Sequence, residues 1–242
     1  MPGRAPSDDN NVPTHHRPTP SLKIAGDTPL SLDGPGGAEF RAVEKWVARR
    51  LREVGHERRV AAVAGSIFDL TAPLHDLTSQ DRRLLLLAAL VHDVGRSVDD
   101  EHHPAEGAGM LLADSALPIN AQTRRALAYL TLYHRGAVPD PEEDDVLHPG
   151  DDHQRLRTVL GMLKAADGLD GRSLPTPQLV FALVAGRDRR APELRVNCYL
   201  PCESAKARQV YTRRKKFRLL EETVGCRVEV EVALAQGLRM VA

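Results

Sequence analysis

The dipeptide His92-Asp93 stands at the end of an apolar segment, and its two side chains are well suited to binding a metal. Residues 84–91 read Leu-Leu-Leu-Leu-Ala-Ala-Leu-Val, which is apolar on every side of a helix and predicts a buried central helix. Two ionisable groups at the end of such a helix are costly to desolvate unless something pairs with them. Imidazole nitrogen and carboxylate oxygen are both ordinary ligands of iron, manganese or zinc. The pair therefore indicates a buried metal site.

Four further histidine and aspartate residues share the apolar faces of other predicted helices: His56, His103, His134 and Asp167. Positions i, i+4 and i+7 lie on one helix face, which groups His56 with Val60 and Val63, and the other three follow the same pattern. Taken alone, any one of them fits a core histidine bonded to a carbonyl or an aspartate that caps a helix. Together they would destabilise a common core unless a cation joined them, so the set favours a metal centre.

The composition narrows the class of protein. The 242 residues suffice for one substantial helical domain and a small appendage. Because 33 basic residues balance 33 acidic ones, no global field favours nucleic acid or a membrane surface. No apolar run approaches the roughly 20 residues of a membrane span, and the N-terminus lacks the basic-then-apolar pattern that is typical of a secretion signal. Three cysteines are no disulfide framework and lack a fourth zinc ligand, so we expect free thiols and a cytoplasmic location.

The chain divides into three predicted regions. Residues 1–37 are rich in Pro, Gly, Ser, Asp and Asn and predict a flexible tail. Helical periodicity then predicts helices at about 38–54, 56–69, 79–91 (with Ser79 as the N-cap), 104–114, 121–134 and 152–169, with an acidic, proline-broken loop at 136–152. Beyond Pro175 the pattern predicts strands at 179–184, 194–200 and 226–232 and a basic amphipathic helix at 203–223. We therefore expect a mainly α fold: a helical domain at 38–174 followed by a small α+β module at 175–242.

The order of these residues resembles a known signature. His56, then His92-Asp93, then Asp167 resembles the H…HD…D pattern of the HD-domain metal-dependent phosphohydrolases, and residues 90–96 (Leu-Val-His-Asp-Val-Gly-Arg) match the central motif of that superfamily almost verbatim. His103 and His134 resemble the extra histidines of its dinuclear members. The resemblance implies that the helical domain is an HD-type bundle.

Within that superfamily, residues 38–242 are most similar to the C-terminal HD domain of the exopolyphosphatase / guanosine pentaphosphate phosphatase family. The shared features are a double histidine after the HD motif, a Tyr-His-Arg, a helix ending in Ala-Asp-Gly-Leu-Asp and a final strand-helix-strand module. That family carries its phosphatase activity in two actin-like domains ahead of the HD region. Because a short tail precedes that region here, we expect any hydrolysis to take place at the HD-type site itself.

The resemblance implies a metal-dependent phosphohydrolase that cleaves a phosphoester or phosphoanhydride bond, with a nucleotide as the expected substrate and a metal-activated water as the attacking group. One or two divalent ions (manganese, iron or magnesium) are implied. The implied metal ligands are His56, His92, Asp93 and Asp167 for one ion and Asp93, His103 and His134 for a second, with His92 and Asp93 also assigned to catalysis. Three cationic side chains beside them suit phosphate binding: Arg96, Arg135 and Lys164, each of which fits a salt bridge or a solvated helix end equally well.

Two other interpretations remain open at this point. The same fold could serve as a non-catalytic nucleotide-binding, polyphosphate-binding or regulatory protein. Alternatively, the basic run at 208–218 could bind nucleic acid or polyphosphate, but the interleaved Val210 and Phe217 favour a solvated helix face. The expected partner is thus a phosphorylated small molecule rather than a membrane or a nucleic acid, and a homodimer through either part of the chain stays open.

Overall fold

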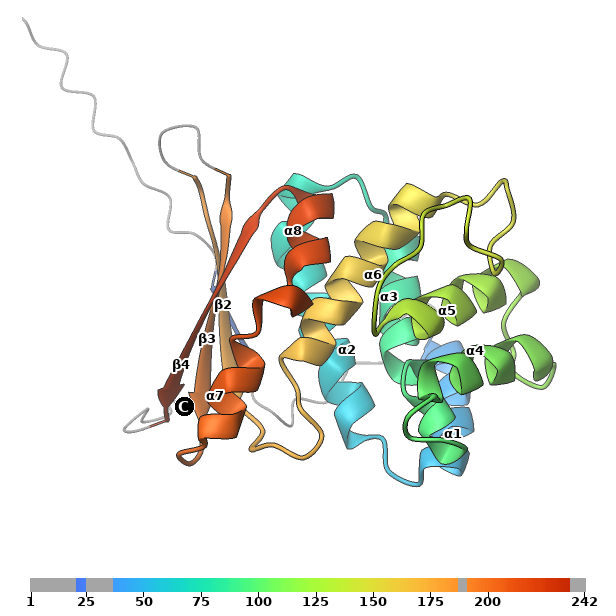
Figure 1. Ribbon diagram of the computed structural model, residues 1–242, viewed down its shortest axis with the longest axis horizontal. Coiled ribbons are helices and arrows are strands. Elements are labelled where there is room, and N and C mark those ends of the chain that lie inside the picture. The colour runs from blue at the N-terminus through green and yellow to red at the C-terminus, as the bar shows by residue number, and fades with distance from the viewer. Residues whose placement is uncertain (1–20, 25–36, 187–190, 236–242) are drawn as a thin grey trace, which may run out of the picture.

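Helices make up most of the first two thirds of the chain (Figure 1). The computed structural model describes residues 21–24, 37–186 and 191–235. The helices of this part are α1 (Gly37–Leu51), α2 (Gly55–Thr71), α3 (Ser79–Val91), α4 (His103–Ala113), α5 (Ala121–Tyr133) and α6 (His153–Gly168), with 3-10 helices at Ala72–Leu74 and Val94–Ser97. The predicted mainly α bundle is confirmed. Among the described helices, none combines the length and the apolar character needed to cross a membrane.

Helix α3 is the central helix, as its sequence predicts. Every residue from Leu84 to Val91 is buried, so α3 has an apolar surface on all sides within the bundle. A capping box starts the helix, in which the Thr78 backbone N–H donates to Asp81 Oδ2 over 2.8 Å. The prediction of Ser79 as the N-cap is therefore wrong by one residue, because Asp81 occupies the third helical position only when Thr78 is the cap.

A four-stranded sheet lies at one end of the molecule (Figure 1). Its order is β1 (Ser21–Ile24), β2 (Gln178–Val184), β3 (Glu193–Leu200) and β4 (Arg227–Leu234), with antiparallel pairs β1/β2 and β2/β3 and a parallel pair β3/β4. The three strands predicted after Pro175 are present. The prediction of a flexible tail over 1–37 is wrong at Ser21–Ile24, because an edge strand pairs through backbone hydrogen bonds and needs little apolar pattern. Residues 1–20 and 25–36 of that predicted tail lie outside the described residues.

The connection between β3 and β4 differs from the single helix predicted over 203–223. It consists of α7 (Ala205–Tyr211), a 3-10 helix at Arg214–Lys216 and α8 (Arg218–Val224). Tyr211 and Phe217 are both fully buried. In one continuous helix these two residues would point about 120° apart around the helix axis, given 3.6 residues per turn. The break therefore allows both aromatic rings to enter the core.

The helical bundle and the C-terminal module pack on each other through α6 and α8. Their buried apolar residues belong to one core cluster. Gly161 of α6 faces the backbone of α8 so closely that an added Cβ would lie 2.9 Å from Leu220 N. The module is thus seated against the helix that carries Asp167.

We predict that Gly161→Ala lowers the free energy of unfolding by about 1–3 kcal/mol, because the new methyl group meets backbone atoms that cannot rotate away. Gly109→Ala in α4 is the matched control. Nothing lies within 4 Å of its added Cβ, so replacing glycine there should raise stability by about 0.5–1 kcal/mol. Urea unfolding followed by circular dichroism measures both values. Equal effects of the two substitutions would contradict the close contact between α6 and α8.

Candidate metal centre

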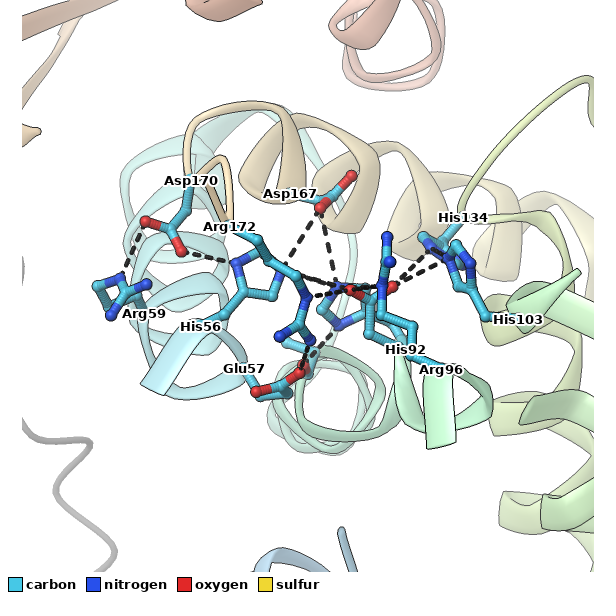
Figure 2. A network of polar contacts seen from close by, with 12 residues as sticks. His56, Glu57, Arg59, His92, Arg96, His103, His134, Asp167, Asp170 and Arg172 are labelled. Atoms are coloured by element: carbon cyan, nitrogen blue, oxygen red, sulfur yellow. Dashed lines mark hydrogen bonds and ion pairs between the residues drawn. The ribbon is translucent and has the colours of Figure 1, made fainter. Parts of the chain in front are cut away.

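The six predicted ligands converge at the ends of five helices. Figure 2 shows the four histidines and Asp167 among them. His56 lies in the first turn of α2, His92 caps the C-terminus of α3 and Asp93 follows it. The remaining three stand at other helix ends: His103 begins α4, His134 caps α5 and Asp167 lies in the last turn of α6. All of them except Asp167 are buried, and the Asp167 side chain is 13% exposed. The structure therefore brings together every residue of the predicted ligand set.

Asp93 is shared by two groups of three ligand-type side chains. Donor atoms of His56, His92 and Asp93 lie within 4.8 Å of one another, and so do those of Asp93, His103 and His134. Asp93 Oδ1 is 3.1 Å from His103 Nε2 and 3.4 Å from His134 Nε2. Asp167 Oδ1 adjoins the first group, at 3.7 Å from His56 Nε2 and 3.8 Å from His92 Nε2. The arrangement could hold a metal ion in either group.

A close approach of α4 to the HD motif places His103 in this cluster. An added Cβ on Gly95 would clash with the His103 carbonyl oxygen and lie 2.5 Å from Gly107 N. No residue with a side chain fits between these backbones. Gly95 therefore lets the start of α4 lie directly against the turn that follows Asp93.

Hydrogen bonds on the outer sides of the rings determine which nitrogen faces the centre. The Nδ1 atoms of three histidines donate to carbonyl oxygens: His92 to Ala89 at 2.8 Å, His103 to Asp100 at 2.8 Å and His134 to Thr131 at 2.6 Å. His56 Nδ1 donates to the Asp170 carboxylate at 2.7 Å. Because carbonyl and carboxylate oxygens only accept, each Nδ1 carries the proton. In the neutral rings, all four Nε2 atoms then direct lone pairs at the centre.

These lone pairs face one another at short distances. His56 Nε2 lies 3.3 Å from His92 Nε2, and His103 Nε2 lies 3.4 Å from His134 Nε2. The neighbouring carboxylate oxygens of Asp93 and Asp167 are acceptors as well, so neutral histidines bring only acceptors together. Positive charge at the centre, as a metal ion or an added proton, removes this repulsion. The donor set therefore fits a divalent cation.

The electrostatics of the metal-free site agree with this description. Burial lowers the pKa of His92, but Asp93 and Asp167 outweigh burial and raise this pKa to about 9. Burial alone would raise the pKa of Asp93, yet His92 and the hydrogen bonds to His103 and His134 hold it far below its ordinary value. Burial lowers the pKa of His134 to about 4. At neutral pH the carboxylates of the site are thus ionised and His134 is neutral, whereas His92 carries a second proton and is positively charged.

Asp170 orients His56, which the sequence analysis did not anticipate. Asp170 is only 3% exposed. Its carboxylate accepts from His56 Nδ1 at 2.7 Å and from Arg59 Nε at 2.9 Å. The spacing of Asp167 and Asp170, about one helical turn apart, was the signal in the sequence that both face the same cluster.

Two arginines hold the far oxygen of Asp93. Arg96 Nε donates to Asp93 Oδ2 at 2.8 Å, and Arg172 Nε donates to the same oxygen at 2.7 Å. Arg172 also pairs with Glu57, which is fully buried. Neither Arg172 nor Glu57 was predicted. Arg96, predicted to contact phosphate, is thus placed against the shared aspartate.

The other two predicted phosphate-binding residues line a different pocket from the one lined by Arg96. Lys164 Nζ donates to the carbonyls of Tyr133 at 2.8 Å and Gly136 at 3.0 Å, and burial together with the charge of Lys216 lowers its pKa to about 8. Lys216 Nζ donates to Asp167 Oδ2 at 2.7 Å. A pocket of about 420 Å³, which we call the lysine pocket, is lined by His134, Arg135, Gly136, Lys164, Arg213, Lys215 and Lys216. It combines a cluster histidine with cations of the C-terminal module.

The family model for Ppx/GppA phosphatase, domain III, matches residues 41–173, which is more than half of the 242 residues. The chain belongs to this family. The predicted resemblance is thereby confirmed. The residues matched to domain III include all six clustered side chains, Asp170 and Arg172, whereas Lys216 lies outside the match. No curated protein sequence matches the chain.

We predict that Asp170→Asn weakens metal binding by about 10–100-fold, because His56 loses the carboxylate that fixes its ring and raises its basicity. Asp99→Asn is the matched control, since Asp99 makes a similar contact with the exposed His102, whose Nδ1 lies 3.2 Å from Asp99 Oδ2. Titration of manganese into the metal-free proteins measures the affinities. Unchanged affinity in Asp170→Asn, or an equal loss in Asp99→Asn, would contradict the assigned role.

Proposed function

We propose that the protein is a metal-dependent phosphohydrolase that cleaves a phosphoester or phosphoanhydride bond of a nucleotide. The observation that carries the proposal is the pair of ligand groups that share Asp93 in a buried site. The match to domain III of a phosphatase family supports a phosphorylated substrate, and the two ligand groups supply the site at which this chain would hydrolyse it. The experiment described below separates this function from the alternative of a binding protein without turnover.

The proposed ligands follow the two groups. His56, His92, Asp93 and Asp167 would hold one ion, and Asp93 would join His103 and His134 on the other. Among manganese, iron and magnesium, four imidazole nitrogens suit iron best and magnesium least, because magnesium prefers oxygen ligands. When bound, divalent ions would supply positive charge that polarises a phosphoryl group and lowers the pKa of a bound water to about 7.

The chain itself supplies binding and orientation. We place the phosphorylated substrate in the lysine pocket, because His134 lines it together with several cations. Arg135 and Arg213 suit phosphate oxygens through their paired N–H groups. Lys216 holds Asp167 Oδ2 and so leaves Oδ1 directed at His56 and His92. Lys164 connects the ends of α5 and α6 at the rim of this pocket.

Asp93→Asn tests the proposal. We predict that the wild-type protein, loaded with manganese or iron, releases phosphate from one or more members of a nucleotide and phosphoester panel. Asp93→Asn should reduce turnover at least about 100-fold, because it neutralises the carboxylate shared by both ligand groups. His102→Ala is the matched control, because His102 is the exposed neighbour of His103 and its loss should leave turnover within about twofold.

Elemental analysis of the purified protein accompanies the assay. Absence of bound metal after soaking, or equal turnover in Asp93→Asn, would overturn the proposal. Metal and nucleotide binding without turnover of any panel member would instead support the non-catalytic alternative.

A further inference from the structure

A second pocket, of about 570 Å³, lies beside the C-terminal end of α1, and we call it the arginine pocket. None of the six clustered ligands lines it. Its donors are four guanidinium groups and two hydroxyl groups: Arg50, Arg52, Arg96, Arg172, Ser97 and Ser173. Two carboxylates, of Glu53 and Asp100, also line the pocket, so the arginines outnumber the acids. The pocket is therefore rich in hydrogen-bond donors.

Three of these arginines are already held in place by carboxylates. The Arg50 guanidinium lies 3.9 Å from the centroid of the Trp46 ring and donates to Asp114 Oδ2 at 2.6 Å. Arg96 and Arg172 each donate through Nε to Asp93 Oδ2, and a terminal nitrogen of each pairs with a second carboxylate, of Asp100 and of Glu57 respectively. A guanidinium has five N–H donors, so these contacts leave others available to a ligand. Side chains fixed in this way lose little entropy when an anion binds.

The fourth arginine has an unusual backbone conformation. Arg52 has φ of 66°, in the left-handed region, and is the one non-glycine residue with positive φ among the described residues. It directly follows α1, where its N–H donates to Ala48 O at 3.0 Å, a position at which glycine is the usual residue. Its side chain is exposed and has no ion-pair partner within the described ranges. A strained residue that brings an unpaired charge to a pocket is characteristic of a binding site.

We propose that the arginine pocket binds a tetrahedral phosphate group, either inorganic phosphate or the phosphate of a phosphomonoester. Arg52 supplies the unpaired cation, and Arg50, Arg96 and Arg172 supply prepositioned donors. Guanidinium groups bind phosphate oxygens through paired N–H donors, which explains why arginine rather than lysine lines this pocket. The site is separate from the lysine pocket and does not depend on the proposed hydrolase function.

The test uses the full chain without metal, so hydrolysis plays no part in it. Inorganic phosphate is titrated calorimetrically into the wild type, Arg52→Gly and Arg213→Ala, the last being a matched arginine of the lysine pocket. We expect Arg52→Gly to weaken one class of phosphate sites about tenfold, the effect of losing one charged hydrogen-bond donor. Arg213→Ala should leave that class within about twofold of the wild type.

Two controls separate loss of the Arg52 charge from loss of folding. Arg52→Gly should unfold at the same temperature as the wild type or higher, because glycine adopts a positive φ without strain. Arg52→Asn also tolerates that backbone, removes the charge and should lose affinity to the same extent. Unchanged affinity in both Arg52 variants, or loss of all phosphate binding in Arg213→Ala, would overturn the proposal.

A parallel titration with glycerol 3-phosphate separates the two sources of the phosphate group. Affinity equal to that of inorganic phosphate assigns the pocket to the phosphate group alone. Tighter binding of the ester assigns it to a phosphomonoester. Absence of binding by both compounds would again overturn the proposal.

Discussion

Mutual repulsion among buried electron pairs is the constraint on which the rest of this structure depends. Four imidazole Nε2 atoms and the carboxylates of Asp93 and Asp167 meet in one interior site, with two pairs of nitrogens 3.3 and 3.4 Å apart. Such a cluster is stable only with positive charge at its centre. Without metal, the second proton on His92 supplies part of this positive charge. Arg172 beside Asp93 and Lys216 beside Asp167 supply more of it.

The fold brings this charge from two directions. Arg96 and Arg172 reach Asp93 from one side, and Lys216 reaches Asp167 from the other. Lys216 belongs to the break between α7 and α8, so the C-terminal module is part of the site although it lies outside the match to domain III. The contact of Gly161 with α8 keeps this module against α6. Stability of the bundle and charge balance of the site are therefore linked.

The clustering of these six side chains could be predicted from sequence, because four of them share an apolar stripe with their own helix and His92-Asp93 ends an apolar helix, which are local properties. Their supporting residues could not be predicted in the same way. The spacing of Asp170 from Asp167 indicates a shared helix face, but no local pattern identifies His56, 114 positions away, as its partner, or pairs Arg172 with Asp93, 79 positions away. The break near Arg213 could not be predicted, because the amphipathic pattern of residues 203–223 also fits one continuous helix. The reason for the break is that both Tyr211 and Phe217 are buried in the core, which only the folded structure shows. Likewise, β1 depends on pairing with β2.

Calorimetric titration of manganese into the metal-free protein in buffers of different ionisation enthalpy tests the central claim most directly, because it counts the protons that the metal displaces. With the pKa of His92 at about 9 and its Nε2 facing the centre, binding at pH 7.5 should release about one proton. Affinity should rise about tenfold per pH unit between pH 7.5 and 9 and level off above pH 9, where His92 is already neutral. Binding without proton release, or affinity independent of pH across this range, would contradict the account.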